Sequence, residues 1–407
     1  MELEHPLPPG MRDLLPDEAA TRRTIARTVL SQFELAGYRL VTPPAFELAE
    51  VIERGLGPLA AEDVLRFIEP ESGDVAVLRP DVTPQIARIV ATRLLDHPPP
   101  FRLAYEGTVV RRRVRRAKKH RQIPQVGVEL CGVSGLESDV EVLALAADAL
   151  RASGLEDFTI DVADAGIVRG LLEGMPSALA DELTAALARK DEAVLGELAA
   201  NIAPLARLHG GRDALLEARA LLAGTRAEEP LRRLTALFDA ASERGLSRHL
   251  RVDVGEVRGF AYYTGMIFSL YAAGPGEPIG AGGRYDDLLA RFGAPMPAVG
   301  LAIDVDGLAW ALREAGRGGA PRDGVVVVGG TDALLAAIRR RGVPAVASPA
   351  RDVERANAYA RSWRFAAVVS ADELPADVEA AAETVLRTAT ELGRKESVDT
   401  ECPAGKG

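Results

Sequence analysis

QIPQVGVELCG, at residues 122–132, predicts a strand with two different faces, because side chains alternate sides along a strand. The apolar face carries Val126, Val128 and Leu130. The polar face carries Gln125, Gly127, Glu129 and Cys131. A glycine inside a strand often marks close approach to the backbone, so this face suits a ligand with N–H donors or positive charge. A half-exposed sheet face with ordinary polar residues remains the alternative.

The segment just before this strand is strongly basic. Residues 111–121 read RRRVRRAKKHR, with eight Lys or Arg in eleven positions. A solvated loop between two strands would explain it. Concentrated like charge is costly unless anions offset it, so a phosphate ligand or an acidic partner surface is favoured.

Working outward, the pattern predicts an α+β domain: an antiparallel sheet flanked by helices. Expected strands lie at 39–41, 64–68, 75–78, 101–105, 109–113, 250–254, 260–272 and 299–305. Expected helices lie at 17–38, 83–95 and 137–152. Leucine- and alanine-rich stripes predict a helical insertion at about 166–247. We expect residues 1–318 to form this domain, 319–393 a small α/β domain with a parallel sheet, and 394–407 a disordered tail.

Composition limits the class of protein. The chain has 407 residues, 47% of them hydrophobic, and a net charge of −10. An acidic chain is a poor nucleic-acid binder, so tRNA binding is not expected. Two cysteines, Cys131 and Cys402, exclude a disulfide framework, and no apolar run reaches membrane-spanning length. We expect a soluble cytoplasmic protein with no membrane contact, no metal and no cofactor.

Residues 258–265, RGFAYYTG, predict a second strand at the site. Alternation would place Tyr262 and Tyr263 on opposite faces, with Tyr263 above small residues. Tyr263 is then either a pocket wall or part of an ordinary aromatic core.

Several ordered motifs resemble histidyl-tRNA synthetase, a class II family, over residues 8–315. They are PGMRDLLP at 9–16, LRPDVT at 78–83, the basic motif 2 region at 107–125, RGFAYYT at 258–264, GGRYD at 282–286 and the motif 3 region at 299–308. The resemblance implies a six-stranded antiparallel catalytic-type sheet, a helical insertion, a shortened anticodon-binding-like C-terminal domain and dimerisation through motif 1.

The resemblance also implies a histidine pocket. The residues it places there are Asp81, Thr83, Arg111, Gln125, Glu129, Arg258, Tyr262, Tyr263 and Tyr285. Asp81 stands where the family has glutamate. Carboxylates and amides accept from an ammonium or imidazole N–H, and an arginine holds a carboxylate.

The nucleotide half of the family's site is altered. Gly307 replaces an arginine that grips the ATP γ-phosphate, Arg113 replaces a glutamate that serves the adenine, and Ala261 replaces an aspartate. A histidine pocket without adenylation is typical of a family of synthetase paralogues, the regulatory subunits of ATP phosphoribosyltransferase. That family implies a non-catalytic homodimer that binds L-histidine and assembles with the short catalytic subunit. A divergent active synthetase and an RNA-binding or amino-acid-modifying paralogue are the alternatives.

Overall fold

The computed structural model of the protein describes residues 7–57, 64–112, 120–257, 262–317, 324–348 and 352–399, with backbone only for 389–399. The chain divides into two compact units, Met1–Gly319 and Ala320–Gly407. No helix among the described residues is long and apolar enough to cross a membrane.

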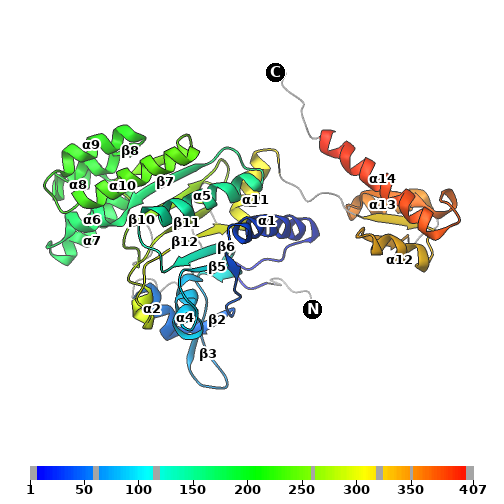
Figure 1. The fold of residues 1–407 in the computed structure, drawn as a ribbon, viewed down its shortest axis with the longest axis horizontal. Helices are drawn as coiled ribbons and strands as arrows, with labels where there is room; N and C mark the ends of the chain where they lie inside the picture. The colour runs from blue at the N-terminus through cyan, green and yellow to red at the C-terminus, as the bar shows by residue number, and fades with distance from the viewer. Residues whose placement is uncertain are drawn as a thin grey trace. The chain divides into compact units, whose positions relative to one another are not determined.

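A nine-stranded sheet organises the first unit (Figure 1). Its spatial order is β1-β5-β6-β12-β11-β10-β7-β9-β8. The strands are β1 (Arg39–Leu40), β5 (Phe101–Val110), β6 (Gln122–Cys131), β7 (Thr159–Asp164), β8 (His209–Gly210), β9 (Leu250–Asp253), β10 (Met266–Tyr271), β11 (Gly280–Arg284) and β12 (Ala298–Asp304). The six strands from β5 to β7 pair antiparallel, which confirms the predicted sheet. β1 and β9 add parallel pairs at the two sides.

Three helices pack on one face of this sheet. They are α1 (Pro16–Leu35), α5 (Leu136–Ala152) and α11 (Val305–Glu314). Ile25, Val29 and Phe33 recur at helical spacing along α1 and are all buried in the core beneath the sheet. The apolar residues of β6 join the same core, as the alternation predicts.

The opposite face of the sheet borders a smaller cluster. It contains the helices α2 (Ala49–Leu56) and α4 (Thr83–Arg93) and an antiparallel sheet of β2 (Phe46–Leu48), β3 (Leu65–Ile68) and β4 (Val75–Leu78). Pro84 occupies the first turn of α4, where its missing N–H costs nothing. This face of the sheet holds the functional site described below.

The helical insertion lies between β7 and β9. Its helices are α6 (Ala165–Leu172), α7 (Ser177–Arg189), α8 (Glu192–Leu198), α9 (Arg212–Leu222) and α10 (Glu228–Ala241). β8 pairs with β9 and makes the insertion part of the sheet. With only two residues, β8 is too short for a sequence pattern to predict. α10 also packs on α5 and β7.

The second unit is a three-stranded parallel sheet in the order β14-β13-β15, with β13 (Val325–Val328) at its centre. Its other elements are β14 (Ala345–Ala347), β15 (Ala367–Ser370), α12 (Asp332–Arg340), α13 (Val353–Ser362) and α14 (Val378–Asp399). α14 continues through Asp399, so the tail predicted from 394 is wrong up to that residue. Residues 400–407 lie outside the described part of the chain.

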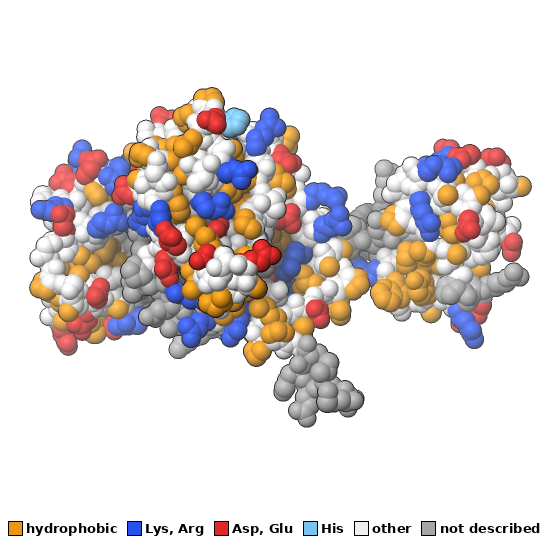
Figure 2. All heavy atoms as spheres, turned by 90° about the horizontal axis from the view of Figure 1, so that it is seen from below, with side chains coloured by type: hydrophobic (Ala, Val, Ile, Leu, Met, Phe, Trp, Pro, Cys, Tyr) orange, Lys and Arg blue, Asp and Glu red, His pale blue; other side chains and the backbone are white. Residues whose placement is uncertain are grey.

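Two further expectations need correction. Residues 101–110 form one strand rather than two, because β5 pairs with β6 without interruption. Of the strand expected at 260–272, the described residues form a strand only at Met266–Tyr271, since the chain turns at Tyr262; residues 260 and 261 lie outside the described part. On the face shown in Figure 2, acidic and basic side chains are interspersed, with hydrophobic side chains in small patches between them.

Candidate functional site

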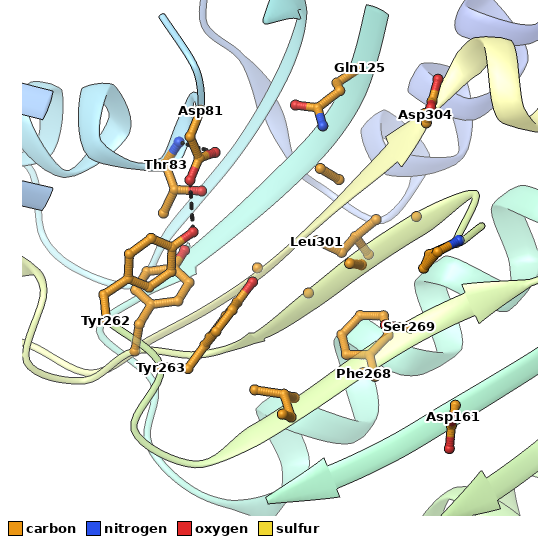
Figure 3. A pocket seen from close by; sticks show the side chains of 18 of the residues that line it. Asp81, Thr83, Gln125, Asp161, Tyr262, Tyr263, Phe268, Ser269, Leu301 and Asp304 are labelled. Carbon is orange, nitrogen blue, oxygen red and sulfur yellow. Dashed lines mark hydrogen bonds between the residues drawn. The ribbon is translucent and has the colours of Figure 1, made fainter. Parts of the chain in front are cut away.

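A cavity of about 270 Å³ lies on the face of the main sheet opposite α1, α5 and α11. Residues from eight elements or the loops beside them line it: α4, β5, β6, β7, β9, β10, β11 and β12. Most of the predicted site residues line it: Asp81, Thr83, Arg111, Gln125, Tyr262, Tyr263 and Tyr285. Figure 3 shows Asp81, Thr83 and the two adjacent tyrosines at one end and Asp304 at the other, with Gln125 between them.

Glu129 does not line this cavity. It is 1% exposed and lies behind the cavity wall, where Thr83 Oγ1 donates to one carboxylate oxygen at 2.6 Å and the Tyr285 hydroxyl donates to the other. Burial raises the pKa of Glu129 well above its ordinary value, although the Thr83 bond opposes this. Glu129 therefore holds two cavity-lining hydroxyls and can reach a ligand only if they move.

The residue across the sheet from Glu129 must be glycine. Gly300 on β12 pairs with Glu129 on β6, and a β-carbon at position 300 would overlap the Glu129 carboxylate. Gly300 itself lines the cavity, so the backbone there forms part of the wall.

Asp81 is the second buried carboxylate. The Tyr262 hydroxyl donates to Asp81 Oδ2 at 2.8 Å, and the Thr83 backbone N–H donates to Oδ1 at 3.3 Å. Burial raises the pKa of Asp81, while the Tyr262 bond and the charge of Arg111 lower it. An ammonium ligand beside Asp81 would favour its charged form.

Both adjacent tyrosines face the cavity, so the prediction of opposite faces is wrong. Alternation applies to extended strands, and the chain turns at Tyr262. Their rings lie 4.9 Å apart, and each packs near Tyr285. Burial raises the pKa of both hydroxyls, which keeps them as neutral hydrogen-bond donors and acceptors.

On the polar face of β6, Gly127 serves a different purpose from the one that the sequence predicts. A β-carbon there would overlap the Tyr105 hydroxyl, so the glycine makes room for this buried tyrosine rather than for a ligand. Gln125 does present an open group: its Oε1 is buried and has no hydrogen-bond donor among the described residues. Such an acceptor is costly without a ligand N–H.

Three residues named above cannot be placed. Arg113, Arg258 and Ala261 lie outside the described residues, together with most of the basic run. Arg111, Arg112, His120 and Arg121 remain, and the Arg111 N–H donates to the Arg121 carbonyl at 3.0 Å.

The far end of the cavity is acidic. The sequence patterns missed its lining carboxylates, which come from β7, the end of β9, the turn before β11 and the end of β12: Asp161, Asp253, Glu256, Glu277 and Asp304. Only the inward direction of Asp161 on β7 could have been foreseen from alternation. Among the described lining residues, Arg111 is the one arginine or lysine.

Gly307 lies in the first turn of α11, next to this end. It is buried, and its backbone N–H donates to Asp304 Oδ1, the N-cap of the helix, at 3.2 Å. A β-carbon there would lie 3.4 Å from Ile279. Its neighbour Asp306 holds Arg12 and Arg22 in ion pairs of 2.7 and 2.9 Å.

The geometry suits reversible binding of a small zwitterion with an extra N–H group. Buried acceptors and aromatic hydroxyls are present, and the described residues include no group of three or more His, Cys, Asp or Glu placed to hold a metal ion. Cys131 is buried, and burial raises its pKa, which makes it a poor nucleophile.

Comparisons with known proteins agree with this geometry. The sequence model of the histidyl-tRNA synthetase family matches residues 10–308. An ATP phosphoribosyltransferase regulatory subunit from Anaeromyxobacter dehalogenans is 43% identical over 336 residues, 79% of this chain and 96% of the relative. One of the same name from Moorella thermoacetica is 39% identical over 348 residues, 82% of this chain and 88% of the relative.

A solved structure is also similar. It is described as an ATP phosphoribosyltransferase regulatory subunit/histidyl-tRNA synthetase from Bacillus halodurans, with a TM-score of 0.79 and 29% identity. The match covers 91% of this chain and 99% of that one.

Proposed function

This chain belongs to the histidyl-tRNA synthetase family, and from that premise we propose that it is a non-catalytic regulatory subunit of ATP phosphoribosyltransferase. In this role it binds L-histidine, the end product, and controls the first step of histidine biosynthesis. It is also required for activity of the short catalytic subunit. The names of its relatives support the subunit role.

The observation that most supports histidine binding is the set of buried acceptors and hydroxyls that line the cavity or lie just behind its wall. Asp81 and the open Gln125 oxygen can accept from an α-ammonium or an imidazole N–H. The Thr83 and Tyr285 hydroxyls, held by Glu129, add donors and acceptors of adjustable direction. Histidine supplies both an ammonium and a ring N–H, while its carboxylate suits an arginine.

The far end of the cavity supports a role without adenylation. Position 307 has no side chain to hold a phosphate, and Arg111 is the one arginine or lysine among the described lining residues. Charge-assisted contacts to transferring phosphates supply much of the catalysis in such reactions. Loss of one arginine from that set is therefore expected to remove most of the activity.

Regulation requires histidine to prefer one state of the assembly, since equal affinity for both states would shift nothing. We propose a homodimer within the hetero-oligomer formed with the catalytic subunit. Mixing the two purified proteins should give activity that neither shows alone, and histidine should inhibit the mixture. Unchanged activity of the catalytic subunit on mixing would contradict the proposal.

A divergent synthetase is the second candidate, favoured by the family match that spans residues 10–308. Histidine-dependent exchange of pyrophosphate into ATP separates the two. Exchange above background would establish the synthetase, and its absence in protein that binds histidine supports the regulatory role.

A further inference from the structure

The helical insertion holds two pieces of chain that line the cavity. Asp253 and Glu256 line it at the end of β9, and Tyr262 and Tyr263 line it where the described chain resumes. Each piece is bonded to residues of the insertion, which lies beside β7 and β10 (Figure 1).

The first piece is fastened at three points. Lys190, between α7 and α8, donates from Nζ to Asp253 Oδ1 at 2.6 Å. The Val254 N–H donates to the Leu208 carbonyl at 3.0 Å. The backbone of Gly255 packs so closely that a β-carbon would lie 2.6 Å from the Leu205 carbonyl oxygen.

The second piece is fastened through α6. Arg169 donates from its guanidinium to the backbone carbonyl of Tyr263. Next to it, the Ala165 N–H donates to the Gly265 carbonyl at 2.9 Å. The tyrosine that lines the ligand cavity is thus tied by its own backbone to the first helix of the insertion.

Space lies behind this second piece. A cavity of about 370 Å³ borders Thr264, Gly265 and Met266 on one side and the α10 residues Arg233 and Leu237 on the other. A closely packed interior resists displacement, whereas a chain segment with a cavity behind it can shift at lower cost. A ligand that presses on Tyr263 therefore has a direction in which to move it.

We propose that Arg169 and Lys190 are positioning residues that couple the ligand cavity to the helical insertion. They set the affinity of the cavity for its amino acid, and occupation of the cavity in turn orders the insertion. Such coupling is reciprocal, so a partner that fixes the insertion would change the affinity by the same factor. The inference rests on the proposed histidine binding and adds the route by which it is communicated.

Lys190 allows coupling to be separated from stability. It has φ 54° and ψ 39°, the left-handed conformation at the end of α7. Glycine adopts this conformation at no steric cost and lysine does not. In Lys190→Gly the relief of this strain offsets part of the cost of leaving buried Asp253 without Lys190, so the Tm of the ligand-free protein should fall less than in Lys190→Ala.

Titration calorimetry of the full chain with L-histidine tests the coupling. Arg169→Ala and Lys190→Gly should each raise the Kd at least about fivefold. Arg169→Lys and Lys190→Arg should restore much of the affinity, and exposed Arg189→Ala serves as the matched control with no effect. Histidine should slow the amide hydrogen exchange of α6 and α7 in the wild type. It should not do so in the double variant that combines Arg169→Ala with Lys190→Gly.

The coupling would be overturned if both variants had Kd values within twofold of wild type, or if hydrogen exchange in the insertion did not respond to histidine. Either result would leave the proposed function standing. No histidine binding by the wild-type protein would instead overturn the proposed function, and the coupling with it.

Discussion

The two ends of the cavity differ in how their acidic groups are used. At the end that suits an amino acid, Asp81 and Glu129 are buried and each accepts from a cavity-lining hydroxyl. At the far end, carboxylates line the wall beside a helix whose first turn holds Gly307. The contrast shows that one cavity can combine an ordered network of hydroxyls and buried carboxylates at one end with a wall of lining carboxylates at the other.

The largest effect is expected at Gly300. In Gly300→Ala the new methyl group would overlap the Glu129 carboxylate, which must then leave Thr83 and Tyr285. We expect histidine binding to become undetectable by calorimetry and the free energy of unfolding to fall by about 1–3 kcal/mol. The control is Gly196→Ala on α8, where the β-carbon enters open space and stability should stay or rise.

If Gly300→Ala bound histidine like the wild type, the Glu129 network would have no part in recognition. The difference between the two ends would then lie only in the lining residues.

Glu129→Gln should change the pH dependence of stability. Because burial raises the pKa of Glu129 above its ordinary 4.5, the folded state binds this proton more tightly than the unfolded state. That contribution is complete below pH 4.5 and is lost as pH rises through the folded pKa. The variant should therefore gain stability relative to the wild type as pH rises above 4.5.

The measurement is urea unfolding of both proteins at pH values below and above 4.5. Parallel curves would mean that Glu129 titrates alike in the folded and unfolded states. The same Gln variant should bind histidine about tenfold more weakly, because its amide has only one oxygen and cannot accept from both the Thr83 and Tyr285 hydroxyls.

A smaller loss is expected from Tyr262→Phe. The variant leaves buried Asp81 without the hydroxyl that lies 2.8 Å away. An unsatisfied buried group costs about 1–3 kcal/mol, part of which a ligand ammonium can restore. We expect lower Tm and a Kd raised about fivefold, measured against Tyr359→Phe in the second unit as the control. A Tyr262→Phe protein with wild-type Tm and Kd would show that Asp81 does not depend on this bond.

The smallest effect on histidine binding is expected from Gly307→Arg. The new side chain starts 3.4 Å from Ile279 and faces a wall that keeps its carboxylates. We expect the histidine Kd to stay within twofold of wild type and pyrophosphate exchange to remain at background. Exchange activity in this variant would mean that an arginine at position 307 is enough to restore adenylation at the far end of the cavity.

Much of this arrangement follows from local patterns. Alternation along β6 predicts which side chains enter the core and which face the site, because the strand is regular and fully paired. The antiparallel main sheet and the parallel C-terminal sheet follow from element order in the same way, and the count of six antiparallel strands comes from the family resemblance.

Other features depend on contacts between distant segments. Gly127 looked like room for a ligand, but its space belongs to Tyr105 on the neighbouring strand. The turn at Tyr262 brings both tyrosines inward, and the acidic wall gathers carboxylates from four separate places in the chain. The length of α14 was missed because its last residues are polar and lack an apolar stripe.

One titration tests most directly whether the cavity keeps recognition and has lost adenylation. Calorimetry of the full chain with L-histidine, followed by Mg²⁺–ATP in the histidine-saturated protein, should give heat and a single-site isotherm for histidine and none for ATP. ATP binding to the saturated protein, or histidine-dependent pyrophosphate exchange in the same sample, would contradict the difference between the two ends.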